Sequence, residues 1–434
     1  MFYLFIFSIP FQTREVLFFA SPEGKFLEWN SGFLYFTDLL LIGIFVLWLA
    51  RLICVRLSLT HIRKGDFLLI GFFLVAGLSL IASQNIGLSV YQIIKLAEFV
   101  LLFLYIKYNL EFLKIKKILT IFVASGAFQA LLAIAQFFSQ SSLGLKHFEA
   151  GIFNANIPGV ATFFVQGVKF IRAYGTAPHP NVLAVFLLVS IFAIYALLLL
   201  NREKRITRLL YALCFILCAL GLFLTFSRAV ILVFVAGSLL FFLVAFFKFK
   251  ELKSGIIGLL LLFIVVCLMF TILFWPEFQA RFLTMSAKEQ AVTLRVYYND
   301  IALSVIKEKP VLGLGLGNFT WYLFNNYQLK EFWLYQPVHN LYLLIAVEIG
   351  IVGLIVFLIF IAKILLKGLK KIQNSLGERE KTQIICFLFL VSCFLFLGLI
   401  DHYFWTIQQS RLLFWVVLGI ISGAFRARKL FSEK

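Results

Sequence analysis

Charged residues are scarce in this chain. Only 14% of its 434 residues are Asp, Glu, Lys or Arg, whereas 62% are hydrophobic, and the mean hydropathy is +1.01. Because soluble domains typically carry about 25% charged residues, this composition excludes an ordinary soluble fold. Repeated apolar runs match the roughly 20 residues that a helix needs to cross the hydrocarbon of a bilayer. The sequence therefore predicts an all-α polytopic membrane protein.

Cysteine is also scarce, and nothing resembling a cleavable leader opens the sequence. The six cysteines lie within or at the ends of apolar runs, without the spacing of metal ligands and without an extracytoplasmic pair, so we expect them to pack in the membrane interior. Residues 1–10 lack a basic n-region, and no small-residue cleavage site follows them, so we expect insertion through uncleaved helices. The cysteines are Cys54, Cys214, Cys218, Cys267, Cys386 and Cys393.

Twelve apolar spans are long enough or nearly long enough to be transmembrane helices. The first is too short to cross alone, so it is either a half-helix or the remnant of a longer start. The twelve spans predict one transmembrane domain over residues 1–434. They are 2–11, 33–50, 67–83, 88–106, 118–138, 181–200, 209–225, 229–247, 255–275, 340–362, 384–400 and 412–425.

The basic residues behind the net charge of +19 lie mostly in short segments between apolar spans. This placement indicates membrane topology and not a surface for nucleic acid. Six segments hold 25 of the 39 Lys and Arg residues, and twelve crossings place all six on one side. Since basic loops stay cytoplasmic, both termini are predicted to be cytoplasmic. The six segments are 51–66, 107–117, 201–208, 248–253, 363–381 and the tail from Arg426.

The opposite, extracytoplasmic side receives two long loops, 139–180 and 276–339, and three shorter segments, 12–32, 226–228 and 401–411. Long loops in a compact membrane protein are usually functional. Within 276–339, apolar residues recur at helical spacing and stop at Pro310, which predicts an amphipathic helix lying on the membrane surface. The recurring residues are Leu294, Tyr297, Tyr298, Ile301, Val305 and Ile306.

Beside helix ends on this outer side, a few cationic side chains lie against the charge rule. They are Arg172, Arg228, Arg295, His339 and Arg411. An arginine near the hydrocarbon boundary either snorkels to water or meets an anion, and its planar guanidinium suits a phosphate or pyrophosphate.

Two outer histidines have both a structural and a chemical interpretation. His179 lies between Pro178 and Pro180, where it is either structural or a ligand or base. His339 begins a long apolar span, where it is either a hydrogen-bonded interface residue or the base that deprotonates an attacking hydroxyl.

A glycine-rich run at 309–319 (Lys-Pro-Val-Leu-Gly-Leu-Gly-Leu-Gly-Asn-Phe) lacks the Gly-Lys-Ser/Thr ending of a nucleotide-binding loop, so it predicts close backbone packing or a close approach to a ligand. It follows the run 225–228 (Thr-Phe-Ser-Arg) and Arg295, and it precedes 339–342 (His-Asn-Leu-Tyr) and 350–353 (Gly-Ile-Val-Gly). In this order the motifs resemble the O-antigen ligase and polymerase family over about residues 220–365, a core that residues 172–181 and 398–411 support.

The resemblance implies a GT-C-like polytopic fold, a donor glycan carried on polyprenyl pyrophosphate and an acceptor that is a glycolipid, a polysaccharide or a protein. It implies that His339 is the catalytic base and that Arg172, Arg228 and Arg295 bind the donor pyrophosphate. Asn340, Asn181, His179 and Arg411 are supporting candidates. We expect an inverting reaction that needs no metal and no cofactor, since no outer His/Asp/Glu cluster with ligand spacing is visible in the sequence.

Three other functions remain open at this point. Within the same chemistry, the chain could polymerise repeat units or glycosylate a protein instead of ligating a finished glycan. A transporter of the lipid-linked glycan would use the intramembrane residues Lys95, Glu98 and Glu348, although Lys95 and Glu98 are three apart on one helix and can pair with each other. A purely structural membrane protein would tolerate replacement of the outer cations.

Overall fold

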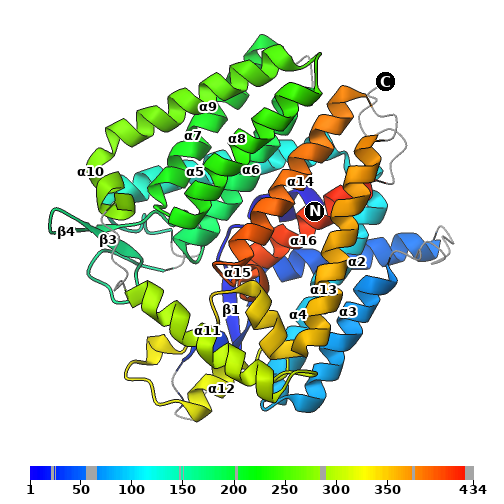
Figure 1. The fold of residues 1–434 in the computed structure, drawn as a ribbon, viewed down its shortest axis with the longest axis vertical. Helices are drawn as coiled ribbons and strands as arrows, with labels where there is room; N and C mark the ends of the chain where they lie inside the picture. Colours follow the sequence, from blue (N-terminus) through cyan, green and yellow to red (C-terminus); the bar gives the residue numbers. More distant parts are fainter. Residues whose placement is uncertain are drawn as a thin grey trace.

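The computed structural model describes residues 1–20, 24, 26–54, 66–145, 148–149, 151–200, 204–283, 290–373 and 377–425. It confirms the all-α membrane fold (Figure 1). Within the described residues, nine helices are long and apolar enough to cross a membrane. They are α2 (Phe36–Cys54), α4 (Ile86–Leu113), α5 (Ile115–Ser139), α6 (Pro180–Leu200), α7 (Arg205–Leu224), α8 (Arg228–Lys248), α9 (Lys253–Leu273), α13 (Leu341–Gln373) and α14 (Glu378–Gly398).

The other three predicted spans form shorter helices. They are α1 (Phe2–Ser8), α3 (Phe67–Leu78), which the 3₁₀ turn η3 (Ser79–Ala82) extends, and α16 (Gln408–Ala424). Every residue of α16 is buried, because α4, α6, α13 and α14 surround it. A helix that meets protein instead of lipid can begin with polar residues, which accounts for Gln408, Gln409 and Arg411 in its first turn.

The first span contains the short helix α1, which ends at Ser8. Tyr3 donates a hydrogen bond to the backbone oxygen of Leu113 at the end of α4 (2.8 Å), so α1 begins level with that end. Beyond α1 the chain is extended, and the backbone N–H of Gln12 reaches the oxygen of Thr176 in the outer loop (3.1 Å). Gln409 donates a hydrogen bond to the backbone oxygen of Phe11 (3.0 Å), so a side chain pairs with a backbone group that lies outside any helix.

Small elements gather on the side predicted to be extracytoplasmic (Figure 1). They are β1 (Arg14–Phe19) paired antiparallel with β2 (Ser31–Tyr35), η1 (Glu28–Asn30), β3 (Thr162–Val165) paired antiparallel with β4 (Val168–Ile171), α10 (Trp275–Phe278), the π-helix η4 (Gln279–Leu283), α11 (Gln290–Glu308), α12 (Phe319–Asn326), η5 (Phe332–Leu334) and α15 (Tyr403–Thr406).

On the opposite side, Lys107 and Tyr108 bind Asp66, and Glu378 accepts the backbone N–H of Glu251 (2.9 Å). Each contact therefore links two of the predicted cytoplasmic segments: 51–66 with 107–117, and 248–253 with 363–381. Most of the segment 51–66, the residue Arg202 and the tail from Arg426 lie outside the described residues.

The predicted amphipathic helix is α11. Its residues Tyr298, Ile301 and Val305 are buried, and it packs against α13. Tyr298 also bonds the backbone oxygen of Leu334. Protein therefore covers the buried face of α11, and contact between this helix and the membrane surface stays a prediction.

The glycine-rich run packs into a break in α13. The predicted continuous span is interrupted at Ile349 and Gly350, where Gly350 has φ +78°. The N–H of Leu314 bonds the oxygen of Val347 (2.9 Å), and the N–H of Ile351 bonds the oxygen of Pro310 (2.8 Å). The run therefore serves close backbone packing, one of the two alternatives that the sequence offered.

We expect Gly350→Ala to destabilise the protein strongly. A Cβ at this position would lie 1.9 Å from the oxygen of Val311, and the positive φ disfavours any side chain. Together these effects should cost about 3 kcal/mol, which lowers the melting temperature in detergent by ~5 °C or more.

Gly258→Ala is the matched control, because Gly258 lies in α9 with nothing within 4 Å of the added Cβ. Alanine should leave the melting temperature unchanged or raise it slightly. Equal melting temperatures for the two variants would contradict the tight packing of the glycine-rich run against α13.

Candidate functional site

Five separate outer segments line one cavity of about 620 Å³. Each segment that the charge rule assigns to the extracytoplasmic side contributes at least one charged or titratable side chain to it. One such residue from each segment, in chain order, is Arg14, Arg172, Arg228, His339 and Asp401. Groups far apart in sequence therefore converge in space, as a substrate site requires.

Arg172 lies at the end of the β3–β4 hairpin and is buried. Its Nε donates to the oxygen of Thr225 (2.6 Å), and its guanidinium donates to Oδ1 of Asn181 (2.6 Å). Asn181 in turn accepts from Ser227 (2.9 Å) and donates to Asp401 (3.1 Å). Asn181 thus connects Arg172 to the carboxylate of Asp401.

Three more arginines line the same cavity: Arg228 at the start of α8, Arg281 in η4 and Arg295 in α11. Together with Arg172 they form what we call the arginine wall. Burial, together with the positive charges of Arg281 and Arg228, lowers the pKa of Arg172 to about 9. The Nε of Arg295 is buried and has no hydrogen-bond partner among the described residues. Clustered guanidinium groups of this kind favour an anionic ligand.

The sequence missed Arg281. It lies near the start of the long loop 276–339, shortly after the predicted span 255–275, and only its outer position could have singled it out. The structure brings it close enough to Arg172 to affect the pKa of that residue.

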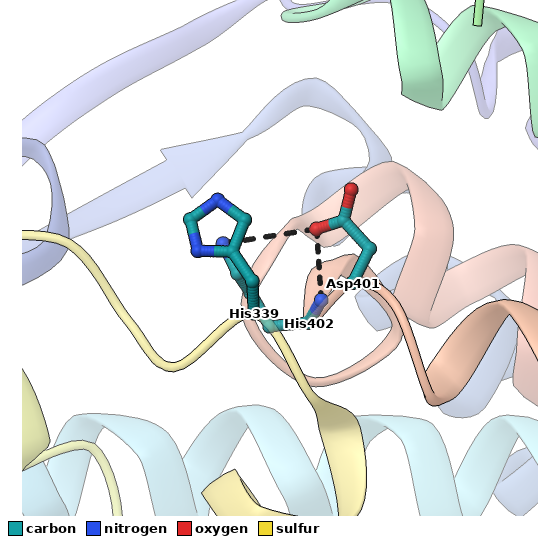
Figure 2. Close-up of side chains that lie close together, drawn as sticks. All are labelled: His339, Asp401 and His402. Carbon is teal, nitrogen blue, oxygen red and sulfur yellow. Dashed lines mark hydrogen bonds and ion pairs between the residues drawn. The ribbon is translucent and has the colours of Figure 1, made fainter. Parts of the chain in front are cut away.

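His339 and His402 lie with their rings edge to face, 4.8 Å apart (Figure 2). Nδ1 of His339 is 3.1 Å from the oxygen of Pro337. Because a carbonyl oxygen only accepts, this contact assigns the proton to Nδ1 and leaves a lone pair on Nε2. His339 therefore has the tautomer that a general base needs.

Asp401 lies beside both imidazoles (Figure 2). Its Oδ1 accepts the backbone N–H of His402 (2.8 Å) and lies 3.9 Å from the Nε2 of that ring. Burial alone would raise the pKa of Asp401, but attraction to His402, His339 and Arg295 outweighs it, so the pKa is lowered. The carboxylate therefore stays charged near neutral pH. In the sequence, Asp401 and His402 belong only to the segment 398–411 that supports the family resemblance. Nothing there pairs them with His339, because neither lies near it along the chain.

The supporting candidates fall in different places. Asn340 does not line the cavity; its Oδ1 accepts the N–H groups of Tyr342 (3.0 Å) and Leu343 (3.1 Å), so it caps α13. His179 lines the cavity, but its Nδ1 accepts the N–H of Asn181 (3.2 Å), so this nitrogen is already engaged.

Arg411 also lines the cavity, but it does so from the side of α4. It donates to Gln92 (2.8 Å), and its guanidinium lies 4.5 Å from the ring centroid of Phe99. It is therefore separated from the group formed by Arg172, Arg228 and Arg281.

One His/Asp group among the described residues could hold a metal ion. Ligand atoms of His339, Asp401 and His402 lie within 4.8 Å of one another. This corrects the expectation that the outer side has no such cluster: residues 339 and 401–402 are brought together only by the fold. Two imidazoles and a carboxylate are a donor set that suits Zn²⁺. The same groups equally suit proton transfer, and the metal-independent reaction stays a prediction.

If His339 serves as a base, enzymatic activity should survive chelation, because a neutral imidazole beside Asp401 can accept a proton without an ion. Activity after treatment with EDTA and 1,10-phenanthroline should then stay within about twofold of that of the untreated protein. Loss of activity that is restored by added Zn²⁺ or Mn²⁺ would instead make the His339–Asp401–His402 group a metal site.

Comparison with known proteins gives a family for part of the chain. Residues 213–358 match the family model described as O-antigen ligase. A Rickettsia conorii (strain ATCC VR-613 / Malish 7) protein, provisionally named a polysaccharide ligase, is 29% identical over 242 residues. The match covers 53% of this chain and 55% of that protein, so the chain spans about half the length of this curated relative.

Among solved structures, one chain of a peptidoglycan synthase complex is 14% identical, with a TM-score of 0.44 over 85% of this chain and 98% of that chain. That likeness is too low to carry an argument. The family match includes Arg228 and Arg295 in the arginine wall and His339 at the cavity. Through residues 213–358, the chain is similar to the O-antigen ligase family.

Proposed function

We propose that this protein transfers a glycan from a polyprenyl-pyrophosphate carrier to an acceptor hydroxyl on the extracytoplasmic face of the bacterial inner membrane. The observation that carries the proposal is the cavity in which His339, with a free Nε2, shares space with Arg172, Arg228, Arg281 and Arg295. The family match supports the reaction class.

A second, apolar cavity supports a lipid carrier for the donor. It has a volume of about 310 Å³ and lies between α7, α8, α9 and α10. Its walls continue those of the first cavity: α8 supplies Arg228 to the first and Ile231 to the second, and the α10–η4 segment supplies Arg281 to the first and Phe282 to the second. An amphiphile with an anionic head and a hydrocarbon tail fits this junction.

The proposed reaction is a single displacement at the anomeric carbon. His339 accepts the proton of the acceptor hydroxyl at Nε2, and the acceptor oxygen forms the new glycosidic bond. The bond from the anomeric carbon to the carrier's phosphate oxygen breaks, and its electron pair leaves with the pyrophosphate. Arginines at a boundary of low dielectric stabilise this charge. Attack opposite the leaving group inverts the anomeric configuration.

The rival transporter function has less support. Lys95 bonds Asp38 (2.7 Å) and Glu98 (2.6 Å), and Glu348 accepts from Trp405 (2.7 Å). These intramembrane charges are therefore held in contacts within the protein, as the pairing of Lys95 and Glu98 predicted. A transport path would need such groups to exchange with substrate.

A deletion strain separates the two functions. If the protein is the transferase, the strain accumulates lipid-linked glycan in the outer leaflet, where a membrane-impermeant endoglycosidase added to spheroplasts releases it. Glycan that is protected until the cells are lysed would instead indicate a transporter. The product lost from the envelope also identifies the acceptor: a glycolipid for a ligase, a chain of repeat units for a polymerase or a glycoprotein for a protein glycosyltransferase.

The pH profile should reflect a His339 that is neutral at physiological pH. Burial lowers the pKa of His339 below its usual 6.5, Arg295 lowers it further, and Asp401 and the oxygen of Pro337 oppose the shift. His402 and His179 lie nearby and are themselves held neutral, since burial lowers the pKa of each to about 3.

Because the base must be unprotonated, the acid limb of the kcat/KM profile should have its midpoint below pH 6.5. Asp401→Asn removes an anion that favours the imidazolium, so it should move the acid limb to lower pH. An acid limb above pH 7, or a shift of the limb to higher pH in Asp401→Asn, would contradict this assignment of the base.

A further inference from the structure

The main cavity is divided by charge. Its arginine wall carries Arg172, Arg228, Arg281 and Arg295, and Asp401 is the one carboxylate among the described residues beside it. On a second wall, positive and negative side chains balance, and they come from the N-terminal hairpin, α13 and α16. The charged residues of this second wall are Arg14, Glu28, Glu348 and Arg411.

The charges of the second wall are paired locally. Arg14 binds Glu28 with both of its terminal nitrogens, one of them at 2.8 Å, and its guanidinium lies 3.9 Å from the ring centroid of Phe33. Arg411 bonds the amide of Gln92 (2.8 Å). This wall therefore offers dipoles and planar polar groups rather than net charge, which suits an uncharged ligand.

The residues of this wall also suit a sugar ring. Trp29 in η1 lines the cavity and lies edge-on to His402, with the ring centroids 5.2 Å apart. An aromatic face packs on the C–H face of a pyranose, while carboxylate and amide groups such as Glu28 and Gln92 bind its hydroxyls. Gln408 also lines the cavity, is 2% exposed, and has an Oε1 without a partner among the described residues.

Position relative to the base gives the wall a role. Displacement requires the acceptor oxygen to approach opposite the leaving pyrophosphate, so the acceptor must lie across His339 from the arginine wall. Trp29 contacts His402, and the ring of His402 packs on His339, so Trp29 lies close to the proposed base.

Resting on the proposed function, we propose that Trp29, Glu28 and Gln92 form the acceptor subsite and bind an uncharged terminal sugar of the acceptor. The N-terminal hairpin, which lies outside the family-matched residues, thus determines what is glycosylated.

The test compares the effect of each substitution on the KM for the acceptor with its effect on the KM for the donor. Wild type and variants, reconstituted in nanodiscs, are assayed with polyprenyl-pyrophosphate-linked glycan as donor and with the glycolipid extract of a strain lacking the protein as acceptor. Trp29→Ala should raise the acceptor KM about tenfold or more and leave the donor KM within twofold. Trp29→Phe, which keeps an aromatic face, should recover most of the acceptor affinity, and Glu28→Gln should raise the acceptor KM severalfold.

Trp333→Ala is the matched control, because Trp333 is an outer-face tryptophan, 50% exposed and absent from the cavity lining. It should change neither KM. If Trp29→Ala does not fold, the acceptor KM values of Trp29→Phe and Glu28→Gln test the subsite instead. Turnover with an unchanged acceptor KM, or an equal rise of the donor KM, would overturn the acceptor subsite alone. Absence of any product with wild-type protein would overturn the proposed function itself.

Discussion

His339→Ala should lower kcat for glycan transfer by about 10²–10⁴-fold, the usual contribution of a positioned general base. The imidazole Nε2 carries a free lone pair because Nδ1 is engaged by the oxygen of Pro337. Alanine leaves the arginine wall in place, so the donor should still bind with nearly unchanged affinity. Single-turnover rates and donor binding, measured on the same reconstituted protein, separate the two effects.

Asn325→Ala provides the control, since Asn325 is exposed on α12 and does not line the cavity. Its kcat should equal that of wild type. If His339→Ala also kept wild-type kcat, the acceptor proton would have to go elsewhere, and the proposed base would be wrong.

Replacing an arginine of the cavity wall should have the second largest effect. Arg228→Lys, Arg295→Lys and Arg281→Lys keep the charge but lose the planar guanidinium, so each should cost about tenfold in kcat/KM. The corresponding alanine variants should cost roughly 10²–10³-fold, as removal of a group that stabilises developing charge does. Initial rates at varied donor concentration provide the measurement.

Arg411→Lys is the comparison for these variants, because Arg411 lines the same cavity from the side of α4 and bonds Gln92. It should leave the donor KM within about threefold. Equal kcat/KM values for lysine and arginine at all three wall positions would contradict bidentate binding of pyrophosphate, and a larger effect at Arg411 would move the donor to the other wall.

The membrane fold was predictable because its main determinant is local. Apolar runs of sufficient length identified each of the twelve spans, and all twelve contain a helix. Two details depended on contacts that composition does not reveal. The first span ends after α1 because Gln409 and Thr176 bind the backbone that follows it, and α13 breaks at Gly350 because the glycine-rich run packs there.

The site was predictable where a residue violated the topology rule on its own. Arg172, Arg228 and His339 stand out as cations on the outer side, and the structure brings them into one cavity. Asp401 and Arg281 did not stand out, because an outer carboxylate is unremarkable and Arg281 belongs to none of the motifs that the sequence shows. Their proximity to the others is a property of tertiary structure and not of sequence spacing.

The central claim is that the cavity catalyses glycan transfer from a pyrophosphate carrier. It is tested most directly by following the purified protein in nanodiscs with donor and acceptor extract, while recording both free polyprenyl pyrophosphate and the anomeric configuration of the new linkage by NMR. The account predicts one pyrophosphate lipid released per glycosidic bond formed, with the anomeric configuration inverted. Retention of configuration, or carrier that crosses the bilayer without any glycosidic product, would contradict it.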